Sequence, residues 1–336
     1  MKKNKIKEAG RGAVSPLFIV VRMNSHASGR NTGGNMEFEY EVKNGEILLK
    51  RIYGSEERVA VPAQIEGLPV TALAPYIFSQ ARREPDQKAA ICGNQVKEMI
   101  LPDSVREIGG YAFYGCYYLE ALTITHRTRD IAGGAFTGCH HLKRLTFRMN
   151  QAEGYCMKDV LSEVHHELKA RLDYKDRRCT LLFPEYYEEA VENTPARMLE
   201  TQFHGSGYSY RQCFQDGVFQ FGEYDRLFQE AQNLESEDFC IELAVTRLME
   251  KEQLSRDAEG VYQSYLMEHR MSAAGWCIEF EQNEILEFLT GFIDWREEEL
   301  SDLIEEANQK GQLEIQSFLM DYKHRHFGKK KKTFDL

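Results

Sequence analysis

The sequence predicts an α+β repeat protein: a short solenoid of β-rich coils with a β-hairpin cap at its N-terminal end, followed by an array of α-helices. Three observations predict this class. The same sequence pattern occurs twice between residues 99 and 147. Two runs in which apolar and polar residues alternate precede this repeat, and apolar residues at helical spacing follow it. A coil of this kind buries its apolar edge only against its neighbours, so stacked coils form an extended contact surface more readily than a closed pocket.

Apolar positions that recur after 23 residues define the coils. They are Ile108 and Ile131, Phe113 and Phe136, Cys116 and Cys139, and Leu119 and Leu142. Residues 99–101 and 122–124 are β-rich runs that we expect to pair as parallel strands, and a Gly-Gly pair permits the tight bend that follows each of them. The aromatic side chain then enters a short helical turn and fills the interior. The two cysteines are expected to stack as a buried ladder.

The solenoid domain is predicted to span residues 36–150. Residues 38–42 and 47–52 alternate around an Asn44-Gly45 turn, which indicates a hairpin that caps the first coil. Residues 59–78 read as a degenerate first coil. Residues 82–88, polar and containing proline, are an insertion relative to the repeat, either a partner contact or a tolerated surface loop.

The run LPDSVREIGGYAFYGCYYLEALTI, followed by IAGGAFTGCHHLKRLTF, resembles the BspA-type leucine-rich repeats common in bacteria. The resemblance covers roughly residues 59–147. It implies a curved, right-handed solenoid that binds proteins, and many members of that family are displayed at the cell surface on long arrays. This chain has few coils and no recognisable export signal, so the expectation is a cytoplasmic protein, with a surface or secreted adhesin as the alternative.

Residues 151–210 are predicted to be a helical capping or linker region. Apolar residues at helical spacing predict an amphipathic helix over residues 158–172, and Pro184 reads as the start signal of another helix over residues 185–192. Between them, residues 179–183 are expected to form a short strand.

Residues 211–327 are predicted to form paired helices. Ala244, Ala274 and Ala307 are 30 and 33 residues apart, which brackets the period of helical-pair repeats. The run ANQKGQLEI is similar to an ankyrin repeat, although the T-P-L-H signature is absent. Residues 328–336 read as a basic C-terminal tail.

Composition narrows the classes of partner. The chain has 336 residues, a net charge of -11 and eight cysteines without a CxxC pair. An acidic chain is a poor non-specific partner for nucleic acid or an anionic membrane, and the scattered cysteines suit reduced thiols. Residues 1–35 are basic and lack periodicity, so we expect them to be disordered. No apolar run approaches the length of a membrane span.

No residue pattern predicts catalysis, a cofactor or a metal. His140-His141 beside Cys139, and the histidines at 165 and 166, lack the spacing of a zinc motif, and a Gly-Ser-Gly run at 205–207 lacks the rest of a phosphate loop. An enzyme with an unrecognised site is therefore the weakest alternative. Exposed aromatic residues concentrate in binding hot spots, and Tyr117 and Tyr118 occupy the loop position that His140 and His141 occupy one coil later. These four are the candidate contacts for a protein partner, with Tyr186 and Tyr187 as further aromatic candidates.

Overall fold

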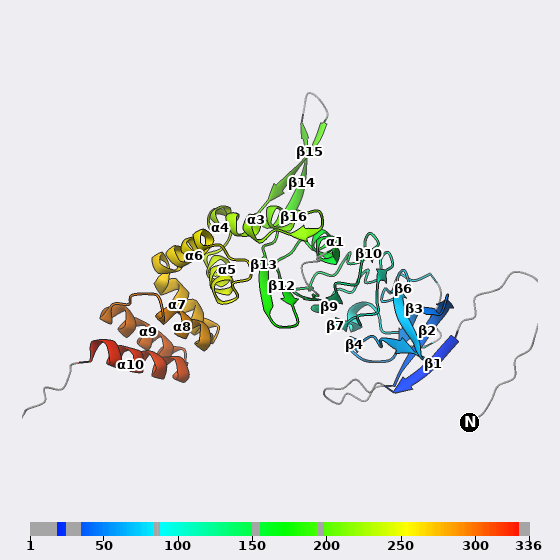
Figure 1. Cartoon of the computed structure of the whole chain (residues 1–336), viewed down its shortest axis with the longest axis horizontal. Helices are drawn as coiled ribbons and strands as arrows, with labels where there is room; N and C mark the ends of the chain where they lie inside the picture. Colours follow the sequence, from blue (N-terminus) through cyan, green and yellow to red (C-terminus); the bar gives the residue numbers. More distant parts are fainter. Residues whose placement is uncertain are drawn as a thin grey trace, which may run out of the picture. The chain divides into compact units, whose positions relative to one another are not determined.

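The structure of the chain is a computed structural model, which describes residues 19–24, 35–83, 86, 88–149, 155–193 and 198–328. Two compact units make up the chain, residues 1–141 and residues 142–336 (Figure 1). The division falls between His141 and Leu142, whereas the sequence placed the end of the solenoid domain at residue 150.

The first unit begins with the predicted hairpin. Strands β2 (Asn35–Lys43) and β3 (Glu46–Tyr53) pair antiparallel, and the turn residues Asn44 and Gly45 have φ values of 52° and 80°, as a tight hairpin turn requires. Strand β1 (Ile19–Asn24) pairs antiparallel with the other edge of β2. The prediction of disorder for residues 1–35 is therefore wrong for these 6 residues, because the edge of β2 offers them backbone partners. The rest of that segment lies outside the described residues.

Two ladders of parallel strands build the solenoid. One joins β3 to β6 (Leu68–Leu73), β8 (Glu107–Ile108) and β10 (Asp130–Ile131), and β5 (Gln64–Ile65) pairs with β6. The other joins β4 (Arg58–Ala60), β7 (Glu98–Ile100) and β9 (Ala121–Thr125). A short 3₁₀ turn, η1 (Gly93–Gln95), lies before β7. Parallel pairing of the repeat strands is thus confirmed.

Aromatic rings and thiols form the core of the coils. Phe78, Phe113 and Phe136 stack in register, with ring centroids 5.0 and 5.4 Å apart. The thiol of Cys116 donates to the carbonyl of Phe78 and that of Cys139 to the carbonyl of Phe113, each at 3.3 Å. The bends are closed by hydrogen bonds between residues three apart, such as the amide of Cys116 to the carbonyl of Phe113. The buried cysteine ladder is confirmed.

The predicted insertion at residues 82–88 is tied to the hairpin by ion pairs. Arg51, whose side chain is 1% exposed, pairs with Asp86 at 2.5 Å and donates to the carbonyl of Ile77. Arg82 pairs with Glu39 at 2.8 Å. The described part of this loop is thereby fastened to β2 and β3, and Arg51 can stay buried because its charge and donors are satisfied.

The second unit begins with a mixed sheet. Strand β11 (Arg144–Arg148) pairs parallel with β12 (Leu168–Asp173), which pairs antiparallel with β13 (Arg178–Phe183), and α1 (Tyr155–Glu163) connects β11 to β12. The predicted strand at residues 179–183 is confirmed. The predicted helix over residues 158–172 is wrong beyond Glu163, because Leu168, Ala170 and Leu172 alternate on the buried face of β12.

The predicted helix at residues 185–192 is also wrong. Strand β14 (Tyr187–Asn193) pairs antiparallel with β15 (Met198–His204), and this hairpin projects from the remainder of its unit (Figure 1). The described part of residues 151–210 is consequently β-rich rather than helical. Pro184 ends β13 and precedes a strand, so it gave a false helix signal.

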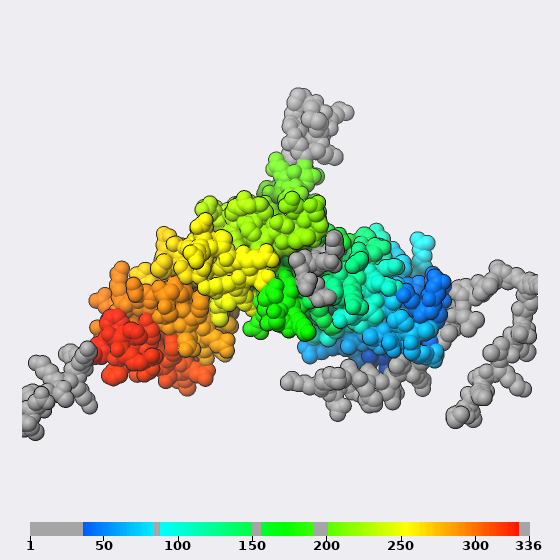
Figure 2. Space-filling model, in the orientation of Figure 1, coloured from blue at the N-terminus to red at the C-terminus, as the bar shows by residue number. Residues whose placement is uncertain are grey.

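Helices complete the second unit. After α2 (Gly207–Arg211) and a short hairpin of β16 (Phe214–Gln215) and β17 (Val218–Phe219), the described helices are α3 (Phe221–Arg226), α4 (Phe228–Leu234), α5 (Glu237–Met249), α6 (Arg256–Glu268), α7 (Arg270–Glu279), α8 (Asn283–Thr290), α9 (Glu297–Gln309) and α10 (Leu313–Phe327). Ala244, Ala274 and Ala307 are fully buried where small side chains let helices approach closely. Helices α9 and α10 pack as the last described pair, and their residues are the orange-red and red atoms in Figure 2. The predicted fold class, a short solenoid followed by a helical array, is confirmed.

Candidate protein-binding surface

The predicted contact residues gather into one group at the surface of the first unit, and all of them except the half-buried His141 are exposed. We call Tyr117, Tyr118, His140 and His141 the aromatic cluster. The ring of Tyr117 lies 5.0 Å from that of Tyr118 and 4.5 Å from that of His141, and His140 contacts the same ring at 5.5 Å. Tyr117 and Tyr118 remain 42% and 46% exposed, so large apolar rings face solvent although they contact one another.

The repeat brings these rings together. Gly115 and Gly138 turn the chain at φ values of +73° and +83° just before the two ring pairs, and a Cβ at Gly138 would lie 3.3 Å from the backbone of Gly115. The absence of a side chain therefore lets the successive loops stack closely. The Nδ1 of His141 donates to the carbonyl of Tyr117 at 2.9 Å, which leaves Nε2 of that ring on the far side.

The chemistry of the cluster suits binding. Tyrosine and histidine rings bury large areas at low cost in conformational entropy, and each keeps a polar atom for hydrogen bonds to a partner. Within the described ranges, no group of three or more His, Cys, Asp or Glu side chains is arranged to hold a metal ion. Burial raises the pKa of the Cys116 thiol to about 12, so this thiol is a poor nucleophile.

The histidines and tyrosines singled out in the second unit have mixed roles. The ring of His165 lies 4.6 Å from Tyr186, and His166 bonds through Nε2 to the carbonyl of Leu142. Tyr186 is buried beneath the guanidinium of Arg211, which lies 5.2 Å from its ring centroid, and supports the fold. Tyr187 is 61% exposed and stacks on His204 at the base of the β14–β15 hairpin.

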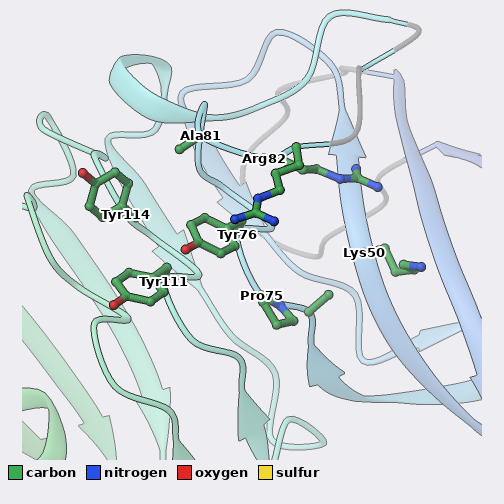
Figure 3. A pocket seen from close by; sticks show the side chains of 9 residues that line it. Lys50, Pro75, Tyr76, Ala81, Arg82, Tyr111 and Tyr114 are labelled. Atoms are coloured by element: carbon green, nitrogen blue, oxygen red, sulfur yellow. The ribbon is translucent and has the colours of Figure 1, made fainter.

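A second group of tyrosines was missed by the sequence interpretation. Tyr76, Tyr111 and Tyr114 line a pocket of about 750 Å³ in the first unit, and Figure 3 shows them on one side of it with Lys50 on the other. Alignment of the coils on Phe78, Phe113 and Phe136 contains the signal. Two residues before each phenylalanine stand Tyr76, Tyr111 and Gly134, and all three have positive φ.

Comparison with known proteins agrees with the solenoid. Residues 87–164 match the family model of the BspA type leucine rich repeat region. This span holds strands β7 to β11 and both ring pairs of the aromatic cluster, so the cluster lies in the part of the chain that is similar to leucine-rich repeats. No curated protein matches the chain.

Two solved structures resemble parts of the chain. The leucine rich repeat protein of T. pallidum is 28% identical, with 34% of this chain and 48% of that chain covered and a TM-score of 0.28. A leucine rich cell surface protein from Faecalibacterium prausnitzii A2-165 is 19% identical, with 41% of each chain covered and a TM-score of 0.27. The match thus spans less than half the length of either protein. Superpositions with such TM-scores carry no argument about function.

Proposed function

We propose that this chain is a non-enzymatic scaffold that binds a protein partner through its leucine-rich repeat loops. The observation that carries the proposal is the aromatic cluster, in which tyrosine and histidine rings from two successive coils lie together, all of them exposed except the half-buried His141. Contact surfaces of this composition concentrate binding energy in a few aromatic residues. The net charge of -11 disfavours nucleic acid as the partner.

The helical array belongs to the same proposal as a second surface. The buried alanines recur after 30 and 33 residues, and α7 with α8, and α9 with α10, follow one another as short-linked helix pairs. This arrangement supports an ankyrin-like array, a class whose stacked pairs bind proteins.

We also propose that the protein is cytoplasmic. All eight cysteines are free, and seven of them are buried, which suits a reducing compartment. None of the described helices is long and apolar enough to cross a membrane. Finding the endogenous protein on the outside of intact cells, by labelling with an impermeant amine reagent, would favour the surface adhesin.

Affinity capture with matched variants tests the scaffold. The full chain, a Tyr117→Ala/Tyr118→Ala double variant and a Val42→Ala control, which changes another exposed apolar residue of the first unit, are used to capture proteins from native cytosol, with mass spectrometry as the readout. Loss of one hot-spot aromatic costs about 2 kcal/mol or more, roughly 30-fold in affinity, so the double variant should release a partner that the control retains. Equal capture by all three chains would refute the cluster as the contact site.

A further inference from the structure

The pocket beside β3 combines aromatic and basic side chains. Tyr76, Tyr111 and Tyr114 line it together with Lys50, Arg82 and Arg83, and the remaining lining residues are Ala74, Pro75 and Ala81 (Figure 3). No carboxylate is among these lining residues. In a chain of net charge -11, a pocket whose ionisable lining is basic apart from its phenols stands out from the average surface.

Two of the tyrosines occupy a backbone conformation that disfavours them. Tyr76 and Tyr111 both have a φ of 58°, in the left-handed region, where a residue with a Cβ pays roughly 1–2 kcal/mol. The equivalent residue of the next coil is Gly134, with a φ of 74° and no such cost. Glycine adopts this backbone conformation without that cost, so the presence of tyrosine in two of the three coils points to a role for the tyrosine side chains.

These side chains form a short exposed ladder. The rings of Tyr76 and Tyr111 stack at 5.2 Å with an interplanar angle of 15°, and Tyr114 packs its edge against Tyr111 at 5.8 Å. A Cβ at Gly134 would lie 2.5 Å from the ring of Tyr111, so that ring rests directly on the glycine. Tyr111 and Tyr114 are still 42% and 39% exposed, which leaves ring surface for a ligand.

Of the two arginines that line the pocket, one is fixed and the other is free of partners among the described residues. Arg82 is held by Glu39 through bonds of 2.8 and 3.2 Å, and both side chains are 11% exposed. Arg83 is exposed and has no hydrogen bond or ion pair within the part of the chain that the structure describes. Its guanidinium is consequently available for a bidentate bond to a carboxylate.

We propose that this pocket binds an acidic, extended segment of a partner protein. The segment would lie across the tyrosine ladder and place an Asp or Glu carboxylate against Arg83, whereas the charges of Arg82 and Lys50 are already paired with Glu39 and Glu41. The inference shares with the proposed function the premise that the chain binds proteins, but it does not depend on the aromatic cluster.

Selection from a random peptide library tests this assignment. Phage-displayed dodecapeptides are selected on the full chain, and fluorescein-labelled copies of the selected peptides are titrated by fluorescence polarisation. We expect enrichment of Asp and Glu over the unselected library. Affinity should fall at least about tenfold in Tyr111→Gly and in Arg83→Glu, and it should weaken as salt is raised. Tyr111→Gly removes the ring while relieving the backbone, and Arg83→Glu changes an exposed residue, so loss of binding in both variants is not explained by loss of fold.

Matched variants separate the possible failures. Arg127→Glu reverses another exposed charge of the same unit, and Tyr117→Ala/Tyr118→Ala alters the aromatic cluster; both should bind the acidic peptides within about twofold of the parent. Selected peptides without acidic enrichment, or unchanged binding in Tyr111→Gly and Arg83→Glu, overturn the assignment. Loss of peptide binding only in the Tyr117→Ala/Tyr118→Ala variant overturns the assignment to the pocket while supporting the proposed function. Stronger binding of a heparin tetrasaccharide than of any selected peptide, lost in the same two pocket variants, overturns the choice of a peptide.

Discussion

Substitution of Tyr111 by glycine should leave the protein more stable than substitution by alanine. Both changes remove the same ring contacts with Tyr76 and Tyr114, so those losses cancel in the comparison. The difference in stability between the two variants therefore comes from the backbone conformation at residue 111. Alanine keeps the left-handed cost of roughly 1–2 kcal/mol, and glycine pays about 0.5–1 kcal/mol of additional conformational entropy. Glycine is therefore favoured by roughly 0.5–1 kcal/mol, the reverse of the usual order.

Tyr114 provides the control. It stands three residues further along, is similarly exposed and does not have a positive φ. Here alanine should be more stable than glycine by about 0.5–1 kcal/mol. Tryptophan fluorescence cannot follow these changes, because Trp276 and Trp295 both lie in the second unit. Hydrogen exchange of the β6 and β8 amides, read by mass spectrometry, measures the opening free energy of the first unit directly. If the protection of these amides from exchange is equal or greater in Tyr111→Ala than in Tyr111→Gly, the argument from backbone strain is wrong.

The remaining predictions concern buried charges. Arg247→Met should lower the free energy of unfolding of the second unit by about 3–5 kcal/mol, because Asp225, 3% exposed, loses bonds of 2.8 and 2.9 Å and keeps only Tyr262. Urea unfolding followed by tryptophan fluorescence measures this loss of stability. As a control, Arg226→Met removes one partner of an exposed ion pair and should cost less than about 1 kcal/mol. Similar losses in both variants would contradict the reasoning. In the first unit, burial alone would raise the pKa of Glu39, but hydrogen bonds from Arg82 and Tyr53 outweigh it and hold that pKa below its ordinary value. Glu39 therefore stabilises the fold above the ordinary carboxyl pKa, and this contribution is lost as the pH falls from there through the lowered value. Glu39→Gln should reduce the loss of exchange protection that the β2 amides show as the pH falls. If that loss is unchanged in the variant, Glu39 is not its source.

Local patterns predicted the solenoid well, because each of its elements is specified by neighbouring residues. The Asn44-Gly45 turn fixes the hairpin register, and the phenylalanine and cysteine positions repeat along the chain. The aromatic cluster followed from the same alignment, since equivalent residues of stacked coils become neighbours.

Long-range partners explain the errors in residues 151–210. The backbone after α1 is held by Arg211, which donates to the carbonyls of Val164 and His166 from 47 and 45 residues away. Strand β14 is specified by its pairing with β15, a partner that helical spacing and a proline signal do not reveal. The tyrosine ladder escaped notice for a different reason, because positive φ at Tyr76 and Tyr111 contradicts what their side chains favour.

The tyrosine ladder has a step length set by the coils beneath it. The buried phenylalanine rings are 5.0 and 5.4 Å apart and the outer tyrosine rings 5.2 Å, because both stacks follow the spacing of paired strands. A ligand lying along the tyrosines would thus meet one ring for every coil. The number of consecutive coils with tyrosine at this position would set the length of ligand that the rings contact, and the series of tyrosines ends at Gly134. A tyrosine at that glycine would cost more than the backbone strain that the two preceding coils already bear, because its Cβ would lie 2.5 Å from the ring of Tyr111, which would have to move.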